Sequence, residues 1–309
     1  MNKKMQFIFL TNSFLSCLSF SSFSQADVSK AKLINIEAPL KNHISFNSFE
    51  SLSSNDHGLI FNNDINDNNQ LANKAAKLIL AEVTGTEESK IKGVLGIKGQ
   101  SANLIIANPN GISWADGSIS NINSLSLIAG KLEKQYVKNK ETKQLEAKAL
   151  DEYSQLKFSV SPASQINISQ QHASPLQLSK LNVFADRIKL QNALNITAAV
   201  QNYLSTSGSA SISPREAVIH SGSKFKTDTP YSQGSHLELG ENTKLLGRLI
   251  SFESHQYQCK DSFLCPQNTI DIKGLIQTMN FSLHGDSDFV MHGTGKIQIG
   301  KNQQVLVAQ

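Results

Sequence analysis

The stretch "IIANPNGISW", residues 105–114, places four consecutive turn-forming residues between two apolar runs. In a type I turn Asn suits the first position, Pro the second and Gly the fourth, so Asn108 to Gly111 predict such a turn. Pro109 also keeps the residue before it out of the helical region, so the preceding strand ends there. We expect Asn110 to bond to nearby backbone through its side chain. The stretch therefore predicts strand, corner and strand in rapid succession.

The same alternation of short apolar runs and turn residues continues from residue 33 to the end of the chain. Apolar and polar residues alternate with period two in many of these runs, which is the signal of a β-strand. Examples are residues 33–36, 77–80, 103–106, 181–184 and 296–299. Patterns of amphipathic helices are nearly absent. The sequence therefore predicts an all-β protein built from short strands.

Two all-β architectures compete for this pattern, a β-sandwich and a parallel β-helix. A sandwich favours longer strands joined by two-residue hairpin turns, and such turns are scarce here. The chain holds 27 Asn and 40 Ser, while charged residues make up only 17%. Asn and Ser side chains bond to backbone at tight corners, which a β-helix repeats in every coil. We therefore favour a parallel β-helix, with a cap of short non-helical elements over the strand edges of its first coil.

The N-terminus has the three parts of a secretory signal peptide. Lys3 and Lys4 precede an apolar run from residue 7 to 15, and a Ser-rich region ends in Ser-Gln-Ala at residues 24–26. The apolar run is too short for a membrane span, which needs about 20 residues. Cys17 leaves a lipoprotein signal as an alternative. We predict cleavage after Ala26, hence export, and the loss of both lysines lowers the net charge from +4 to +2.

The mature chain shows little sign of catalysis or of nucleic-acid binding. Its charge is too balanced for a nucleic-acid partner, and the common motifs of hydrolases, metalloproteases and nucleotide-binding enzymes are missing. The segment "HGDSDFVMHG", residues 284–293, brings two His and two Asp together, but a polar corner explains it better than a metal site. Residues 131–153 are rich in Lys and Glu and predict an excursion from the main fold, as a solvated helix or a charged hairpin. We expect no catalytic residues, no metal and no cofactor.

Residues 75–112 closely resemble the secretion domain of two-partner secretion exoproteins, the filamentous haemagglutinin-type adhesins and related haemolysins. The resemblance rests on "EVTG" at 82–85, "GIKGQSANLIIAN" at 96–108 and the Asn-Pro-Asn-Gly-Ile motif at 108–112. Upstream, "HISFNSFE" and "GLIFNN" also match the family, and "LNVFADRIKLQNALNITA" at 181–198 is similar to its late coil motif. Three features depart from the family, and one of them is the charged stretch at 131–153, which looks like an insertion. Residues 68–71, Asn-Asn-Gln-Leu, stand where many members have Asn-Pro-Asn-Leu, and Trp114 to Gly117 replace a frequent pair of cysteines.

This resemblance implies a haemagglutination activity domain with the fold of a right-handed parallel β-helix. After the signal peptide at 1–26, it implies a two-partner secretion domain at 27–220 and further coils or a truncated passenger at 221–309. The implied partner is an outer-membrane β-barrel transporter with periplasmic recognition domains, together with a receptor on host or bacterial cells. The protein would be secreted from, or displayed on, a Gram-negative bacterium. The residues implied in export are Asn108, Pro109, Asn110, Gly111, Ile112, Asn68, Asn69, Gln70 and Leu71.

The resemblance favours an adhesin-type exoprotein and leaves two alternatives. A haemolysin or cytolysin is the alternative within the family, although no segment resembles a pore-forming module. A carbohydrate-active β-helix enzyme is the alternative outside it. Such enzymes need Arg or Lys beside acidic clusters, whereas the three arginines, at 187, 215 and 248, lie outside any such cluster.

Cys259 and Cys265 are the only cysteines after the signal peptide, and an exported protein can oxidise them. We predict that they form a disulfide across a short loop rather than a metal site, stabilising the protein by about 2 kcal/mol. Mass spectrometry of the secreted protein should find one peptide cross-linked through both residues. Two free thiols after secretion would contradict the prediction.

Overall fold

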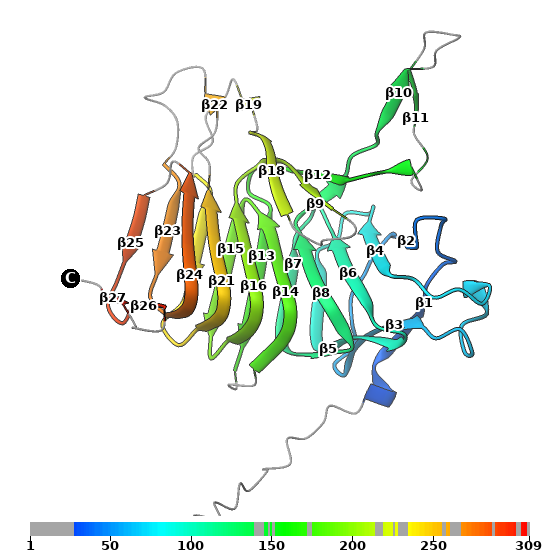
Figure 1. The fold of residues 1–309 in the computed structure, drawn as a ribbon, viewed down its shortest axis with the longest axis horizontal. Helices are drawn as coiled ribbons and strands as arrows, with labels where there is room; N and C mark the ends of the chain where they lie inside the picture. Colours follow the sequence, from blue (N-terminus) through cyan, green and yellow to red (C-terminus); the bar gives the residue numbers. More distant parts are fainter. Residues whose placement is uncertain are drawn as a thin grey trace, which may run out of the picture.

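The structure is a computed structural model, and most of the chain after the predicted signal peptide is described in it. Two long sheets of parallel strands lie face to face and run the length of the molecule (Figure 1). The helices of the described part are the short turns η1 (Val28–Lys30) and η2 (Asn69–Leu71), and neither could cross a membrane. The structure describes residues 28–138, 145–147, 149, 152–171, 175–213, 219–224, 226–227, 234–254, 258–259, 267–285, 288–300 and 304–307.

The first long sheet, sheet A, has nine strands, and every neighbouring pair is parallel. Each strand lies beside the one contributed by the previous coil, so the chain advances by one strand per turn. The strands in order are β1 (Lys32–Asn35), β3 (Gly58–Asn63), β5 (Ser89–Gly99), β7 (Ile112–Ser120), β13 (Gln165–Gln170), β15 (Arg187–Asn192), β20 (His236–Leu239), β23 (Thr269–Ile272) and β25 (Asp288–Met291).

The second long sheet, sheet B, takes the alternate strands and is parallel up to its last strand, β27, which pairs antiparallel with β26. Its strands in order are β2 (Ile44–Phe49), β4 (Leu78–Val83), β6 (Ala102–Ala107), β8 (Ile122–Ile128), β14 (Pro175–Ala185), β16 (Asn195–Ser205), β21 (Lys244–Ser254), β24 (Leu275–Gly285), β26 (Lys296–Ile299) and β27 (Gln304–Val307). Strands that alternate between two parallel sheets make a β-helix, so the predicted all-β, parallel β-helix class is confirmed and the sandwich is excluded.

A third, antiparallel sheet, sheet C, lies outside the β-helix against the outer face of sheet B (Figure 1). Between them lies a second apolar core, which includes Phe158 and Phe184, both fully buried. The charged excursion contains an antiparallel hairpin rather than a helix in its described part. The strands of sheet C and the remaining short strands are β9 (Gly130–Leu132), β12 (Leu156–Val160), β17 (Gly208–Ile212), β18 (Ile219–Lys224), β10 (Tyr136–Lys138), β11 (Leu145–Ala147), β19 (Lys226–Thr227) and β22 (Gln258–Cys259).

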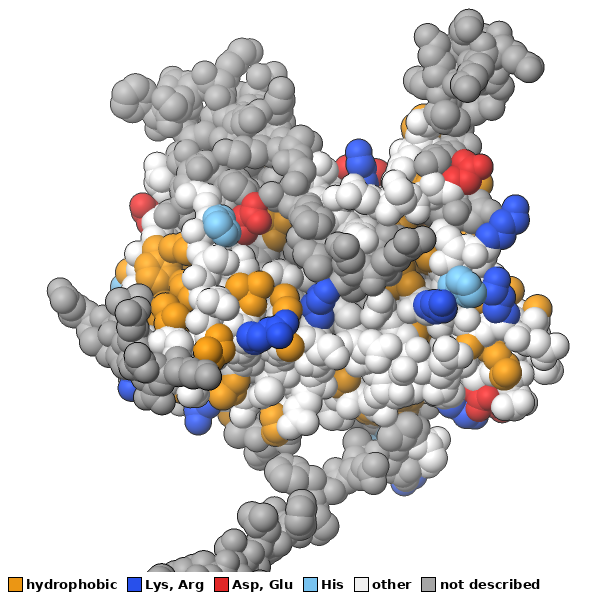
Figure 2. Space-filling view, viewed as in Figure 1, with side chains coloured by type: hydrophobic (Ala, Val, Ile, Leu, Met, Phe, Trp, Pro, Cys, Tyr) orange, Lys and Arg blue, Asp and Glu red, His pale blue; other side chains and the backbone are white. Residues whose placement is uncertain are grey.

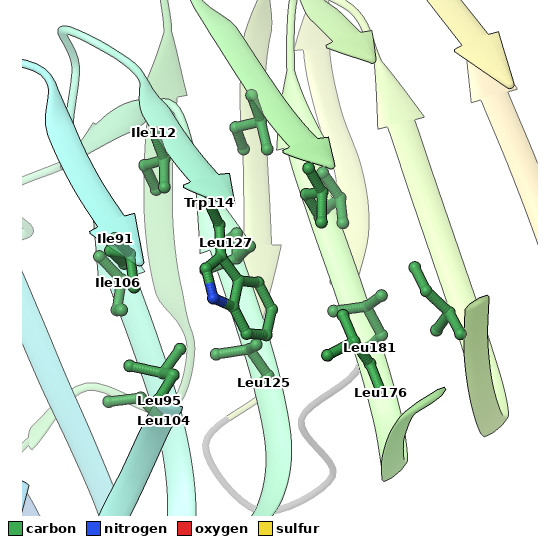
Figure 3. Packing of buried hydrophobic residues seen from close by; sticks show 14 of the residues in the cluster. Ile91, Leu95, Leu104, Ile106, Ile112, Trp114, Leu125, Leu127, Leu176 and Leu181 are labelled. Carbon is green, nitrogen blue, oxygen red and sulfur yellow. The ribbon is translucent and has the colours of Figure 1, made fainter. Parts of the chain in front are cut away.

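The interior of the β-helix is a stack of apolar side chains from successive coils. Trp114 is 1% exposed and lies in register with Ile91 on one side and Ile168 on the other. Its indole points toward Leu125 and Leu127 of sheet B (Figure 3). Gly117 makes room for it, because a Cβ at this position would lie 2.2 Å from the indole nitrogen. Within the segment Trp114 to Gly117, the Trp114 side chain therefore fills the core, whereas Asp116 is exposed.

The first coil is closed by side chains from loops rather than from strands. Ile36 follows β1, Leu52 follows β2, and Leu71 belongs to η2, yet all three are fully buried in the interior cluster. Because these side chains cover the end of the stack, they shield the apolar side chains of the first coils from water. This arrangement agrees with the predicted N-terminal cap of short elements.

The strands are longer than the sequence pattern predicts. Five of them, β5, β14, β16, β21 and β24, each run for 11 residues, and the predicted run 181–184 is only the second half of β14. The chain bends while remaining extended. In β5 the bend is at Gly93, whose φ is +69°, and the register with β7 shifts between Lys92 and Val94. Such bulges bend a strand without ending it, so one strand covers two faces of a coil.

The buried position of Trp114 generates a stability prediction. Trp114→Ala should lower the free energy of unfolding by about 3–5 kcal/mol, because it leaves a large cavity inside a stack that can close only partly. Urea unfolding followed by circular dichroism measures the change. Leu33→Ala, at a side chain that is 49% exposed, serves as the control and should change stability by less than about 0.5 kcal/mol. Equal effects of the two substitutions would contradict the described core.

Candidate functional site

Asn108 is the centre of the predicted corner and is fully buried. The turn closes through a hydrogen bond from the Gly111 amide to the Asn108 carbonyl, at 3.1 Å. The Asn108 side chain donates to the Glu87 carbonyl and to the Ser89 hydroxyl, each at 2.9 Å. Its oxygen accepts the amide of Asn110, also at 2.9 Å. One side chain therefore joins its own corner to the corner of the preceding coil.

The other residues of the motif extend this contact between coils. Asn110 is exposed, and its side chain donates to the Gly85 carbonyl at 2.7 Å, so it binds the preceding coil rather than only its own turn. Gly111 has a φ of +104°, a conformation that favours Gly, and a Cβ there would lie 2.9 Å from the Gln165 carbonyl oxygen. Ile112 is fully buried and begins β7, while Pro109 is half-exposed at the tip.

The "EVTG" segment forms the facing corner of the preceding coil. Gly85 approaches the coil before it so closely that a Cβ would lie 2.2 Å from the Glu50 carbonyl oxygen. Glu82 reaches outward and accepts the Leu132 amide at 2.8 Å, which ties sheet B to sheet C. Burial raises the pKa of Glu82 above its ordinary value, although that hydrogen bond and Lys131 and Lys134 oppose the shift. The two sequence segments that carry the family resemblance are thus in direct contact.

The Asn-Asn-Gln-Leu segment forms a second corner, on an earlier coil. Asn68 caps η2, and its side-chain oxygen accepts the Gln70 amide at 3.1 Å. The side-chain nitrogen donates to the carbonyls of Ile36 and Asn62, both at 2.9 Å. Asn69 and Gln70 are exposed, whereas Leu71 is buried. Asn69 stands where the Asn-Pro-Asn-Leu motif has its proline. The position is exposed, so neither residue type is needed there for packing.

The two corners share one pattern of hydrogen bonds. In each, the first Asn is buried, its oxygen accepts the amide two residues later, and its nitrogen donates to two acceptors outside the turn. Asn68 and Asn108 are therefore equivalent in structure, although only the second corner keeps the Pro. The two corners lie on different coils and do not form one pocket.

Sequence reasoning assigned no role to two further asparagines that carry comparable bonds. Asn63 is fully buried, and its side chain forms a pair of bonds with the backbone of Ala76 and a third with the Gln100 carbonyl. Asn47 bonds to the Glu37 amide and to the carbonyls of Ser45 and Leu80. Asn63 ends the apolar run of β3, which is its only signal in the sequence, and Asn47 lies inside β2 with no such signal. Burial of their amides depends on loops distant in the sequence, so it could not be read from the residues themselves.

Several predicted features fall outside the described residues. These are the signal peptide at 1–26, Cys265 of the predicted disulfide, and Asp286 and Ser287 of the His-Asp segment. The backbone of Cys259 lies in β22, which pairs with β19. Across the described residues, no group of three His, Cys, Asp or Glu side chains is placed to hold a metal ion.

The comparisons with known proteins agree with this fold. The family model described as the TPS secretion domain matches residues 21–294. The crystal structure of a filamentous haemagglutinin secretion domain aligns with a TM-score of 0.56 at 22% identity, and the alignment covers 87% of this chain and 91% of that chain. At this identity the likeness shows the fold, a β-helix.

Relatives of known name match a shorter segment. The filamentous haemagglutinin of Bordetella pertussis is 37% identical over 112 residues, 33% of this chain but 3% of that protein. A haemolysin of Serratia marcescens is 32% identical over 111 residues, 32% of this chain and 7% of that protein. Such a domain implies, in general, an outer-membrane transporter as partner, and its relatives are secreted or surface-associated in Gram-negative bacteria. Because the family match spans most of its length, this chain belongs to the two-partner secretion exoproteins and carries their TPS secretion domain.

Proposed function

We propose that the corner at residues 108–112, together with the corner at residues 68–71, is the export determinant that the partner transporter recognises through its periplasmic domains. The observation that carries the proposal is the difference in burial between two residues of the second corner. Asn108 is buried and holds the coil together, whereas Asn110 is exposed at the tip. An exposed, rigid turn gives a partner a defined surface to bind, and the buried residue maintains its shape.

The bonds of the corner also support export that is driven by folding. Asn108 and Asn110 bond to Gly85, Glu87 and Ser89 of the preceding coil, so the corner can form only when that coil is already in place. Each completed coil then offers backbone amides and carbonyls, and an apolar surface, on which the next coil can fold. Folding that proceeds from coil to coil outside the cell would draw the chain outward and oppose its return.

For the whole chain we propose an adhesin-type exoprotein with a signal peptide at residues 1–26 and no enzymatic activity of its own. The export-competent domain would occupy residues 27–220, and residues 221–309 would continue the β-helix. The haemolysin alternative remains, because a relative bears that name, but the chain spans only a few per cent of its named relatives. Their activities therefore need a direct test in this protein.

The export proposal predicts how two neighbouring substitutions differ. Asn108→Ala should lower the free energy of unfolding by about 1–3 kcal/mol, because it leaves the Asn110 amide and the Glu87 carbonyl unpaired. Asn110→Ala removes exposed bonds and should lower it by about 1 kcal/mol or less. Both variants, and the double variant most of all, should reduce the protein secreted when chain and transporter are co-expressed. Secretion and urea unfolding are measured on the same set.

Two controls separate recognition from stability. Asn63→Ala breaks a buried network outside both motifs, and Asn280→Ala changes an exposed residue of β24. If the tip is recognised, Asn110→Ala should reduce secretion more than Asn63→Ala does, despite the smaller loss of stability. Secretion that simply follows stability across all variants would show that the corner acts only through folding. Normal secretion of the double variant would remove the export role altogether.

The adhesin-type proposal predicts that the purified mature chain agglutinates erythrocytes without lysing them. Haemoglobin release and the viscosity of polysaccharide solutions, measured in parallel, test the haemolysin and the carbohydrate-active enzyme. Haemoglobin release at concentrations that do not agglutinate cells would favour the haemolysin instead. A fall in viscosity would identify an enzyme.

A further inference from the structure

Asn110 and Gly111 form the only Asn-Gly pair in the sequence. An Asn side chain before Gly is open to attack by the next backbone nitrogen, because Gly has no Cβ to hinder the approach. Asn is accordingly among the thermolabile residue types of proteins. Asn110 is exposed, so water reaches its side chain. The corner that carries the family motif therefore also contains a pair of residues that can react with each other.

The reaction open to this pair is deamidation through a cyclic imide. The Gly111 nitrogen, after loss of its proton, forms a bond to the side-chain carbonyl carbon of Asn110. The bond from that carbon to the side-chain nitrogen breaks, and the nitrogen takes up the proton and leaves as ammonia. Water then adds to either carbonyl of the imide ring and opens it to aspartate or isoaspartate. The net change consumes one water and releases one ammonia, without an oxidant or a reductant.

The folded corner holds both reacting groups in hydrogen bonds that oppose this reaction. The Gly111 amide donates to the Asn108 carbonyl at 3.1 Å, so the proton of the attacking nitrogen is not free to leave. The Asn110 side-chain nitrogen, which is the leaving group, donates to the Gly85 carbonyl at 2.7 Å and to the Asn108 side-chain oxygen at 3.0 Å. Ring closure must rotate the peptide between the two reacting residues, and this rotation would break the first of these bonds.

Neighbouring coils hold the same peptide on its other side. The Gly111 carbonyl accepts the Ser89 amide at 3.1 Å, and a Cβ on Gly111 would lie only 2.9 Å from the Gln165 carbonyl oxygen. The peptide is thus enclosed between the preceding and the following coil. Reaction in the folded protein therefore requires that the corner opens first. Each net hydrogen bond that must break lowers the population of the open corner about fivefold.

The product of the reaction does not fit the corner. A carboxylate at position 110 cannot donate, so it would face the Gly85 carbonyl and the Asn108 side-chain oxygen, which now accept the amide. Glu87 and Glu88 belong to the facing corner, and acidic side chains lie along the edge where the strands of sheet B end, at the top of Figure 2. The new charge therefore adds repulsion. In isoaspartate the backbone is also longer by one methylene group.

We propose that Asn110 is a site of spontaneous deamidation that is closed by folding of the corner. In the unfolded chain the Asn-Gly pair reacts, and the product can no longer form the bonds that join this corner to the preceding coil. Once the corner has formed, the same bonds protect the amide. The pair thus limits the time for which the chain can stay unfolded and still fold correctly. This inference does not depend on recognition of the corner by the transporter.

Peptide mapping of the purified full chain, kept for equal times in buffer and in guanidinium chloride at the same mildly alkaline pH, tests the proposal. Mass spectrometry measures the conversion of Asn110 to the acid, and labelling by an isoaspartyl methyltransferase detects the isoaspartate form. We expect conversion at least about tenfold faster in the denaturant, because more than one bond must break before the folded chain reacts. Gly111→Ala should slow the reaction in the denaturant. Equal rates in both solutions, or no conversion in the denaturant, would overturn the proposal.

Two variants weakened at different places separate opening of the corner from general instability. Asn108→Ala removes bonds of the corner itself, whereas Asn63→Ala breaks a buried network elsewhere. In buffer, Asn108→Ala should convert Asn110 several-fold faster than Asn63→Ala does, with circular dichroism confirming that both are folded. Ser89→Ala, which removes one acceptor of the Asn108 side chain, takes its place if Asn108→Ala does not fold. Equal conversion in the two kinds of variant would assign the protection to global stability and contradict the proposal.

Asn110→Asp reproduces one product and tests its effect on the fold. At neutral pH it should lower the midpoint of urea unfolding more than Asn110→Ala does, because Ala removes the bonds without bringing a charge to the Gly85 carbonyl. Asn280→Asp, at an exposed position of β24, is the matched control and should leave the midpoint unchanged. A midpoint for Asn110→Asp equal to that of the unaltered chain would show that the product fits the corner, and the proposed limit on the unfolded chain would then be wrong.

Discussion

A buried side-chain amide that bonds to neighbouring coils is the interaction on which this structure depends. Backbone ladders join strands within each sheet, but they end at the corners, where amides and carbonyls would otherwise be buried without partners. Asn63, Asn68 and Asn108 supply those partners, each with bonds beyond its own turn. Because each amide serves two segments, one corner stabilises the next. The large number of Asn in the chain follows from this need.

The apolar interior depends on the corners for its alignment. Rows of side chains stack in register from coil to coil, as Ile91, Trp114 and Ile168 do, only if each coil returns to the same place. Ile36, Leu52 and Leu71 close the N-terminal end of that stack from loops. Outside it, sheet C covers part of sheet B and creates the second core. At the margin of this covering a groove of about 1220 Å³ remains, lined by the starts of β4 and β6 and by residues 152–154.

The same geometry relates folding to secretion. The bonds from Asn108 and Asn110 to the preceding coil are consistent with the proposed folding of the chain from its N-terminal coils onward. Asn110 is exposed and Pro109 is partly exposed, whereas Asn108 is buried, so in the proposed mechanism the partner would contact Asn110 and Pro109. Under the export proposal, folding and recognition would therefore use different residues of one short motif. A known secretion domain has the same fold at 22% identity, so the coil geometry persists where most residues differ.

The sequence by itself determined the all-β class, the β-helix and the position of the Asn-Pro-Asn-Gly corner, because period-two runs and turn residues act through local backbone preferences. It also identified the secretion family through short motifs. Only the tertiary structure decided that Asn108 is buried and Asn110 exposed, that Asn63 and Asn47 join coils, and that five strands run for 11 residues each. Sheet C and its groove were equally invisible in the sequence. These features arise where segments distant in the chain meet, and no local preference of a residue specifies which distant carbonyl will lie beside its amide.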